Sequence, residues 1–160
     1  LEARVNTKEA TLVDYNTYVL CGDGDLMEGI SYEAASLAGS LKLGRLIVLY
    51  DSNNVTLDGK TQGVFDEDVI KRFDSQGWHT DVVANGEDFN SISQAITRAK
   101  SVSDKPSIIE VKTIIGIGTS VAGTSEAHGK ALSEDDIIRV VINGKEDRKD
   151  EYVTRTISCF

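Results

Sequence analysis

Two apolar runs, each ending in polar residues, constrain the fold of this chain more than any other feature. The run Tyr18–Cys21 stops at Gly22-Asp23-Gly24, and the run Leu46–Tyr50 is followed by Asn53-Asn54. Between them apolar residues recur at helical spacing, namely Ile30, Ala34, Leu37, Ala38 and Leu41. This pattern predicts two parallel strands joined by a crossover helix. Asp23 and Asn53 then follow the carboxyl ends of neighbouring strands, where ligands of parallel sheets bind.

The rest of the chain repeats this alternation of strands and helices. Further strands are predicted around Asp81–Val83 and at Ser107–Lys112, with a helix from Phe65 to near Gly77 and another capped by Asp88. Ser133 is expected to cap a last helix, after a long glycine-containing loop over residues 113–130. The sequence therefore predicts an α/β fold, a parallel sheet with helices on both faces. Residues 1–144 are expected to form one domain and residues 145–160 a charged, irregular tail.

Composition narrows the class of protein. The chain has 160 residues and a formal net charge of -9, so binding to a nucleic-acid backbone is not expected. Its two cysteines, Cys21 and Cys159, have neither zinc-site nor disulfide spacing, which favours a reducing cytoplasm. No apolar run approaches the length of a transmembrane helix, so no membrane association is expected.

The residue types at the two strand ends suit a cation and a phosphate. Glycines beside Asp23 allow a sharp turn and close approach of a ligand, and the N-terminus of the following helix favours an anion. Asp23, the Asn53 amide oxygen and a backbone carbonyl in the Asn54-Val55 turn are hard oxygen donors of the kind that Mg²⁺ or Ca²⁺ takes. Alone, Gly-Asp-Gly predicts only a tight turn; together with Asn53 it favours a metal site.

The GDG sequence followed by Asn53-Asn54 resembles the thiamine-diphosphate-binding motif. GDGDLMEGISYEAASLAGSLKLGRLIVLYDSNN, TLDG at Thr56–Gly59 and KTIIGIGTSVAGTSEAHG at Lys112–Gly129 resemble transketolase in particular. The likeness runs from about Leu1 to Ile137 and implies the diphosphate-binding domain, incomplete at its N-terminal side. It departs at Ala127, where the family has serine, and no family pattern is found over residues 139–160.

The resemblance implies a role for each matching residue at the diphosphate. Asp23, Asn53 and the carbonyl of Val55 would ligate Mg²⁺ or Ca²⁺. The backbone N–H of Gly24 and the Asn53 side chain would contact the diphosphate, and His128 would lie near the diphosphate and the sugar substrate.

Other implied roles have structural alternatives. Leu57 and Ile115 would pack on the thiazolium region, or else belong to the core. Glu28 would join a carboxylate network across a dimer interface, although an acid in a first helical turn also suits the helix dipole. Tyr32 is expected on the helix surface or at a dimer contact.

The implied function is that of part of a transketolase, with thiamine diphosphate and Mg²⁺ (or Ca²⁺) as cofactors. Such a protein transfers two-carbon ketol groups between sugar phosphates. The pyrimidine-binding domain would come from a homodimer partner or a complementary subunit, so the isolated chain is expected to be inactive. An alternative is a non-catalytic remnant or stand-alone module. A related 2-oxo-acid dehydrogenase is a third reading, against which KLGRLIVLYDSNN and AGTSEAHG argue.

Overall fold

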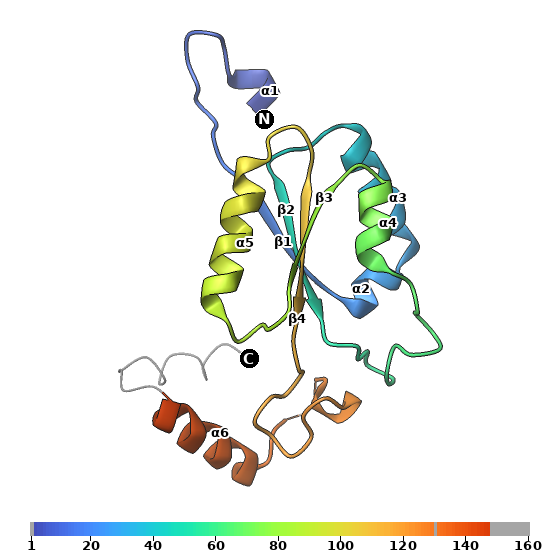
Figure 1. The fold of residues 1–160 in the computed structure, drawn as a ribbon, viewed down its shortest axis with the longest axis vertical. Helices are drawn as coiled ribbons and strands as arrows, with labels where there is room; N and C mark the ends of the chain where they lie inside the picture. The colour runs from blue at the N-terminus through green and yellow to red at the C-terminus, as the bar shows by residue number, and fades with distance from the viewer. Residues whose placement is uncertain (1, 130, 148–160) are drawn as a thin grey trace. The chain divides into compact units, whose positions relative to one another are not determined.

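The structure is a computed structural model that describes residues 2–129 and 131–147 (Figure 1). The chain divides into two compact units. The first consists of Leu1–Ser52 and Gly63–Thr113, and the second of Asn53–Gln62 and Ile114–Phe160. The first unit contains the sheet. The second contains two segments that follow strands of that sheet in the sequence.

The first unit is built on a four-stranded parallel sheet, as the sequence predicts. Its strands are β1 (Thr17–Gly22), β2 (Leu46–Ser52), β3 (His79–Val83) and β4 (Ser107–Lys112), in the order β1-β2-β4-β3. Every neighbouring pair is parallel. The apolar run Leu46–Tyr50 becomes the central strand β2, which is covered on both faces, whereas the run Tyr18–Cys21 becomes the edge strand β1.

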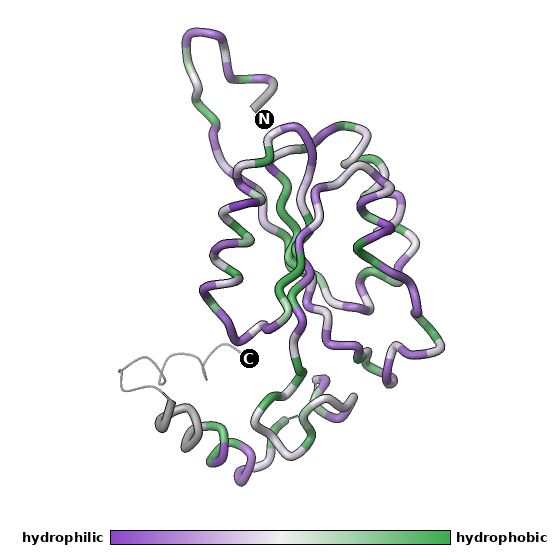
Figure 2. Tube along the Cα trace, in the orientation of Figure 1, coloured by the Kyte–Doolittle hydropathy of each residue, from purple (hydrophilic) through white to green (hydrophobic). Residues whose placement is uncertain are grey.

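Helices cover both faces of the sheet, which confirms the predicted architecture (Figure 1). On one face, α2 (Asp23–Met27), α3 (Gly29–Ser40) and α4 (Val69–Ser75) share a core cluster with β2 and β4. On the other face, α5 (Phe89–Ser101) packs Ala95 and Ala99 against Ile47, Ile109, Val83 and Val111. Figure 2 shows hydrophobic residues concentrated along the strands between these layers.

The packing of α3 on the end of α4 is close enough to require glycine. A Cβ added to Gly39 would lie 1.9 Å from the carbonyl oxygen of Gln76, so no side chain fits there. The indole of Trp78 donates a hydrogen bond to the carbonyl of Ala35 at 2.8 Å. These contacts fix α3 against the first face of the sheet.

Two helix boundaries differ from those that the sequence predicts. The helix expected after Asp23 is broken at Glu28, whose φ of -67° and ψ of 134° are extended, so α2 and α3 are separate helices. The helix expected from Phe65 begins only at Val69. Asp66 instead accepts from the N–H of Gly63 at 2.9 Å, and Asp68 caps α4 by accepting from the N–H of Lys71 at 3.0 Å.

The remaining helices begin where expected. Asp88 caps α5, accepting from two backbone N–H groups at 3.0 and 3.1 Å. Near the N-terminus lies the short α1 (Glu2–Val5). In the second unit, η1 (Ser125–Ala127) is a 3₁₀ turn within the long loop, and α6 (Glu134–Asp147) starts after Ser133. The predicted domain boundary at residue 144 stays a prediction; α6 runs past it to Asp147, and residues 148–160 lie outside the described residues.

Strand β1 forms one edge of the sheet, since it pairs with β2 alone. Leu20 is 81% exposed and Tyr18 47% exposed. Cys21 is half-buried against the first core cluster. Among the described residues no further strand pairs with the outer side of β1, so its residues are less covered than those of the central strands.

Within the described residues, no helix combines the length and apolar character needed to cross a bilayer.

Candidate functional site

The first part of the candidate site is the turn after β1. Asp23 is the first residue of α2 and is only 3% exposed. The backbone N–H of Gly22 donates to Oδ2 of Asp25 at 2.8 Å, which closes the turn. Gly24 is exposed, and an added Cβ would meet no atom within 4 Å. A ligand can therefore approach the backbone of Gly24 beside a buried carboxylate.

The Asp23 carboxylate is oriented by a tyrosine on the neighbouring strand. The hydroxyl of Tyr50 donates to Oδ1 of Asp23 at 2.5 Å, and both residues are 3% exposed. Cys21 pairs with Tyr50 in the β1–β2 register, so the strand alignment places the hydroxyl at the start of α2. Burial, and then the hydrogen bond to Asp23, raises the pKa of Tyr50, which keeps the hydroxyl a donor at neutral pH.

The thiol of Cys21, which precedes the turn after β1, has low reactivity. Burial and the nearby carboxylates of Asp25, Asp23 and Asp51 raise the pKa of Cys21 to about 12. A thiol must lose its proton to act as a nucleophile or a metal ligand. Cys21 therefore serves the packing of β1, as the sequence indicates.

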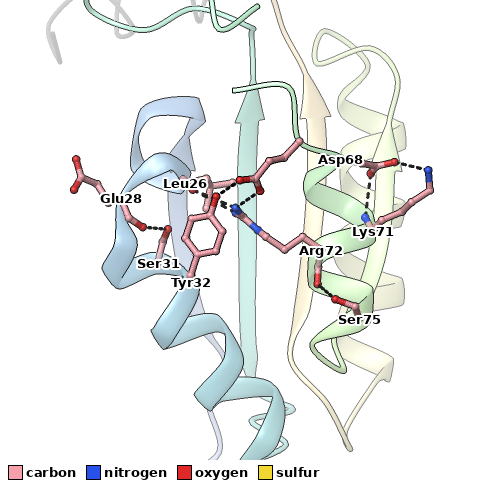
Figure 3. A network of polar contacts seen from close by, with 9 residues as sticks. Leu26, Glu28, Ser31, Tyr32, Asp68, Lys71, Arg72 and Ser75 are labelled. Atoms are coloured by element: carbon pink, nitrogen blue, oxygen red, sulfur yellow. Dashed lines mark hydrogen bonds and ion pairs between the residues drawn. The ribbon is translucent and has the colours of Figure 1, made fainter. Parts of the chain in front are cut away.

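Glu28 lies at the break between α2 and α3. Its side chain is exposed, while its carbonyl accepts from the hydroxyl of Ser31 at 2.6 Å and from the N–H of Ser31 at 3.0 Å (Figure 3). Glu28 thus precedes α3 and does not lie inside one long helix. The carboxylate is available to a partner, whereas the turn itself is held by backbone groups.

Arg72 connects the two helices on either side of this break. Both terminal guanidinium nitrogens lie 3.4 Å from the carbonyl of Leu26, in the last turn of α2, and the guanidinium carbon lies 4.0 Å from the ring centre of Tyr32 on α3. Nη1 also pairs with Oε2 of Glu67 at 2.6 Å. Figure 3 shows Arg72 reaching from α4 toward Tyr32 and Leu26. Tyr32, expected on the helix surface, is half-buried under this guanidinium.

The second part of the candidate site is the turn that follows β2, in the second unit. Oδ1 of Asn53 accepts from the N–H of Val55 at 2.9 Å. Asn54 has a φ of 60°, in the left-handed region that asparagine tolerates better than most residues. Val55 is 4% exposed and bridges to Lys60. The Asn53 side chain and the Val55 backbone therefore belong to one short, internally bonded turn.

Leu57, further along this loop, is 68% exposed, so the alternative that it belongs to the core is wrong. The side chain of Leu57 is therefore on the surface of this loop.

The third part is the glycine-containing loop after β4. The N–H of Gly123 donates to the carbonyl of Ile115 at 2.8 Å, and Ile115 is half-buried. Gly116 has a φ of 64°, and an added Cβ would come 2.7 Å from Cβ of Ala127. His128 is exposed and follows η1, its N–H donating to Ser125 at 3.0 Å. The loop thus holds Ile115, next to Gly116, and His128, next to Ala127, in one folded segment.

The donors proposed for a cation fit a hard metal. Among the described residues no three His, Cys, Asp or Glu side chains gather as a metal cluster. The candidate set is instead one buried carboxylate, one amide oxygen and one backbone carbonyl, from Asp23, Asn53 and Val55. Oxygen donors without nitrogen or sulfur suit Mg²⁺ or Ca²⁺ and not zinc. The residues present therefore fit the metal that the sequence suggests.

Sequence reasoning missed the contacts of three residues, namely those of Tyr50 with Asp23, Arg72 with Leu26 and Asp136 with Ser120. Tyr50 carried a signal, since a buried tyrosine at the end of an aliphatic run needs a partner for its hydroxyl. Asp136 stands three residues after Ser133, at capping-box spacing. Arg72 gave no signal, because its contacts come from segments distant in the sequence.

Comparison with known families gives one match over nearly the whole chain. Residues 1–153 match the family model described as "Transketolase, thiamine diphosphate binding domain". The match extends beyond Ile137, so the expectation that residues 139–160 carry no family pattern is wrong for residues 139–153.

Similar proteins of known sequence and of solved structure point to the same family. The chain is 52% identical over 137 residues to the transketolase of Streptococcus pyogenes, covering 86% of this chain and 19% of that protein. It is similar to the structure of Pichia stipitis transketolase in complex with sedoheptulose-7-phosphate (TM-score 0.85, 43% identity, 89% of this chain and 21% of that one). It is also similar to Leishmania mexicana transketolase (TM-score 0.87, 41% identity, 94% and 23%). The chain spans about a fifth of the length of these relatives.

Proposed function

The chain belongs to the transketolase family, where it corresponds to the thiamine diphosphate binding domain, and on this premise we propose that it binds the diphosphate end of thiamine diphosphate through a divalent cation. The observation that carries the proposal is the buried Asp23 carboxylate, oriented by Tyr50 at the carboxyl end of β1. Keeping a carboxylate charged in a buried position is costly, and a bound cation offsets that cost.

The cation is proposed to be Mg²⁺ or Ca²⁺, with ligands from two strand ends. Asp23 supplies a carboxylate oxygen, Asn53 its amide oxygen and Val55 its carbonyl. The internal hydrogen bond from Val55 to Asn53 supports this set, since it limits the orientations that the amide can take before a metal arrives. Phosphate oxygens and water would complete the coordination that Mg²⁺ demands.

The diphosphate is proposed to contact the backbone N–H of Gly24 and the Asn53 side chain. With a net charge of -9 the chain as a whole repels anions, so a bound phosphate needs a cation or a local group of backbone N–H donors. The open space around Gly24 supports close approach of a phosphate to the backbone. The short α2 adds only the N–H groups of one turn, so most of the attraction would come from the metal.

The remaining site residues are proposed to act on the rest of the cofactor and on substrate. Leu57 and Ile115 would pack against the thiazolium region, and the exposure of Leu57 supports a role outside the core. His128 would hydrogen-bond the diphosphate and the sugar substrate. Glu28 would join a carboxylate network with a partner subunit, which its exposed position supports.

For the whole protein we propose ketol transfer between sugar phosphates in the cytoplasm. Bound thiamine diphosphate supplies the nucleophilic carbon and the electron sink of that reaction. This chain orients the diphosphate, and a homodimer partner or complementary transketolase subunit supplies the pyrimidine-binding domain. The second candidate function is a binding module without catalysis.

Isothermal calorimetry with thiamine diphosphate tests the binding claim. The wild-type chain should bind in the presence of Mg²⁺ and not in its absence. Asp23→Asn should weaken binding by more than about tenfold, since even outer-shell groups at metal sites contribute that much. Asp58→Asn is the matched control, because Asp58 is an exposed acid and the charge change is identical. A folded wild-type chain that gives no heat with Mg²⁺ and cofactor would overturn the proposal.

A further inference from the structure

The loop that carries Ile115 and His128 lacks a hydrophobic core of its own. Among the described residues 114–129 and 131–140, the buried one is a carboxylate, Asp136, at 5% exposure. Apolar side chains of the loop face outward, with Ile114 56% exposed and Ile117 47% exposed. Polar contacts must therefore give this segment much of its conformation.

The carboxylate of Asp136 accepts hydrogen bonds from two separate residues of this segment, Ser120 and Ser133. Its Oδ1 accepts from the backbone N–H of Ser120 at 2.7 Å. Its Oδ2 accepts from the hydroxyl of Ser120 at 3.0 Å and from the hydroxyl of Ser133 at 2.8 Å. Hydrogen bonds to a charged acceptor are stronger than those between neutral groups. Three such bonds to one buried carboxylate hold Ser120 and Ser133 firmly in place.

The arrangement departs from ordinary helix capping. Ser133 caps α6 and accepts from the N–H of Asp136 at 3.1 Å. In a capping box the acid three residues later reaches back to the N–H of the cap residue. Here the carboxylate also reaches Ser120, 16 residues earlier in the chain. The capping acid thus holds a distant loop in addition to its own helix.

Ser120 lies at the centre of the turns that shape the loop. The N–H of Thr119 donates to the carbonyl of Gly116 at 3.0 Å, and the N–H of Gly123 closes on Ile115 at 2.8 Å. Gly116 in turn lies against Ala127, the residue before His128. Holding Ser120 therefore fixes the backbone on both sides of it, including Ile115 and the approach to His128.

We propose that Asp136 is a positioning residue, which anchors residues 114–129 so that Ile115 and His128 are presented in one fixed arrangement. The backbone N–H of Ser120, and then the hydroxyl of Ser133, lowers the pKa of Asp136, so the anchor is charged at neutral pH. The ligand-binding consequence rests on the proposed function, whereas the anchoring itself does not.

Hydrogen exchange of the full chain, followed by mass spectrometry, tests the anchoring. Asp136→Ala should reduce protection in peptides covering residues 114–129 by about tenfold or more, since bonds to a charged group are lost. Peptides from β2 and β4 should be unchanged. Asp136→Asn should give an intermediate loss, because its amide oxygen can still accept from the N–H of Ser120. Asp135→Asn is the matched control and should behave as wild type, since Asp135 is an exposed acid in the same helical turn.

Calorimetry with Mg²⁺ and thiamine diphosphate provides the second readout. Asp136→Ala should weaken binding by about tenfold, and Asp135→Asn should leave it unchanged. If the wild-type chain does not bind, the proposed function fails and hydrogen exchange alone decides the anchoring. Equal protection of residues 114–129 in wild type and Asp136→Ala would overturn the inference. It would equally be overturned if Asp136→Ala and Asp136→Asn lost protection throughout the sheet, since that marks a general folding role.

Discussion

Tyr50 on β2 donates its hydroxyl to the carboxylate of Asp23 at 2.5 Å, and the two residues are equally buried. Tyr50→Phe removes the donor and leaves a buried acceptor with one bond fewer. We expect a loss of about 1–3 kcal/mol in the free energy of unfolding. Chemical denaturation of the metal-free chain measures it.

The matched control for that change is Tyr18→Phe, because Tyr18 is 47% exposed on β1 and removal of its hydroxyl should alter stability by less than about 0.5 kcal/mol. Similar losses in the two variants would show that the Tyr50 hydroxyl contributes nothing specific. Saturating Mg²⁺ and thiamine diphosphate should raise the free energy of unfolding of Tyr50→Phe toward that of the metal-free wild type, since a ligand that binds only the folded chain stabilises it.

Asn54 provides a test of the turn that holds Asn53 and Val55. Its φ of 60° strains a β-branched residue, so Asn54→Val should cost about 1–2 kcal/mol more than Asn54→Gly, which adopts this φ without strain. Calorimetric affinity for Mg²⁺ and thiamine diphosphate should fall in Asn54→Val and persist in Asn54→Gly. Equal behaviour of the two variants would mean that the turn does not govern the ligand positions.

Arg72 should contribute more to stability than a surface arginine with a similar ion pair. Arg72 has a side chain that is 12% exposed, and Arg72→Met removes the donor to Oε2 of Glu67 and to the Leu26 carbonyl. We expect a loss of about 2 kcal/mol or more. Arg98→Met is the comparison, since the Arg98–Asp81 pair has the same kind of geometry at 2.7 Å but a 51% exposed arginine side chain.

The loss for Arg98→Met should stay below about 1 kcal/mol. Denaturant midpoints of both variants measure the difference. If Arg98→Met destabilises the chain as much as Arg72→Met does, the contacts of Arg72 across the α2–α3 break carry no special weight.

The free energy of unfolding should decrease at alkaline pH because of Cys21. Its pKa rises from the ordinary value of 9.0 to about 12 on folding. Between pH 9 and 12 the unfolded chain releases the thiol proton while the folded chain retains it, so rising pH favours unfolding. Denaturation curves at several pH values measure the slope.

Cys21→Ala should reduce this alkaline slope, although part of it should persist above pH 10. The remainder comes from Tyr50 and Tyr32, whose pKa values are raised from the ordinary value of 10.0 by burial and by the hydrogen bond to Glu67, respectively. An unchanged slope in Cys21→Ala would show that the thiol does not titrate differently in the folded and unfolded chains.

The central strands were predictable from the sequence because they are largely apolar runs bounded by glycine or polar residues. Leu46–Tyr50 and Ser107–Val111 lie at the centre of the sheet, and their composition is dictated by burial on both faces. The placement of Asp23 and Asn53 after β1 and β2 followed from the same pattern. Their roles as ligands stay predictions.

The helix boundaries were less predictable because turn geometry competes with apolar periodicity. The helical spacing of Ile30, Leu37 and Leu41 contains no signal for the break at Glu28. Phe65 and Asp66 have the sequence of a helix start, yet Asp66 bonds to Gly63 and Asp68 provides the cap. The first residue of such a helix depends on which of several possible capping residues the packing of α4 brings into position.

The supporting contacts of the site could not be predicted because they join distant segments. Arg72 meets Leu26 across 46 residues and Asp136 meets Ser120 across 16. Contacts between residues so far apart in the chain leave no periodic pattern in the sequence.

The Tyr50–Asp23 bond has a consequence for how the chain folds. Cys21 and Tyr50 are partners in the β1–β2 alignment, and Tyr50 faces α3 and α4. A slip of one residue would turn Tyr50 toward α5 and away from the carboxylate. Only the native alignment can therefore present a properly oriented Asp23. A cofactor present during folding would act as a template, since it would select the correctly aligned sheet from its misaligned competitors.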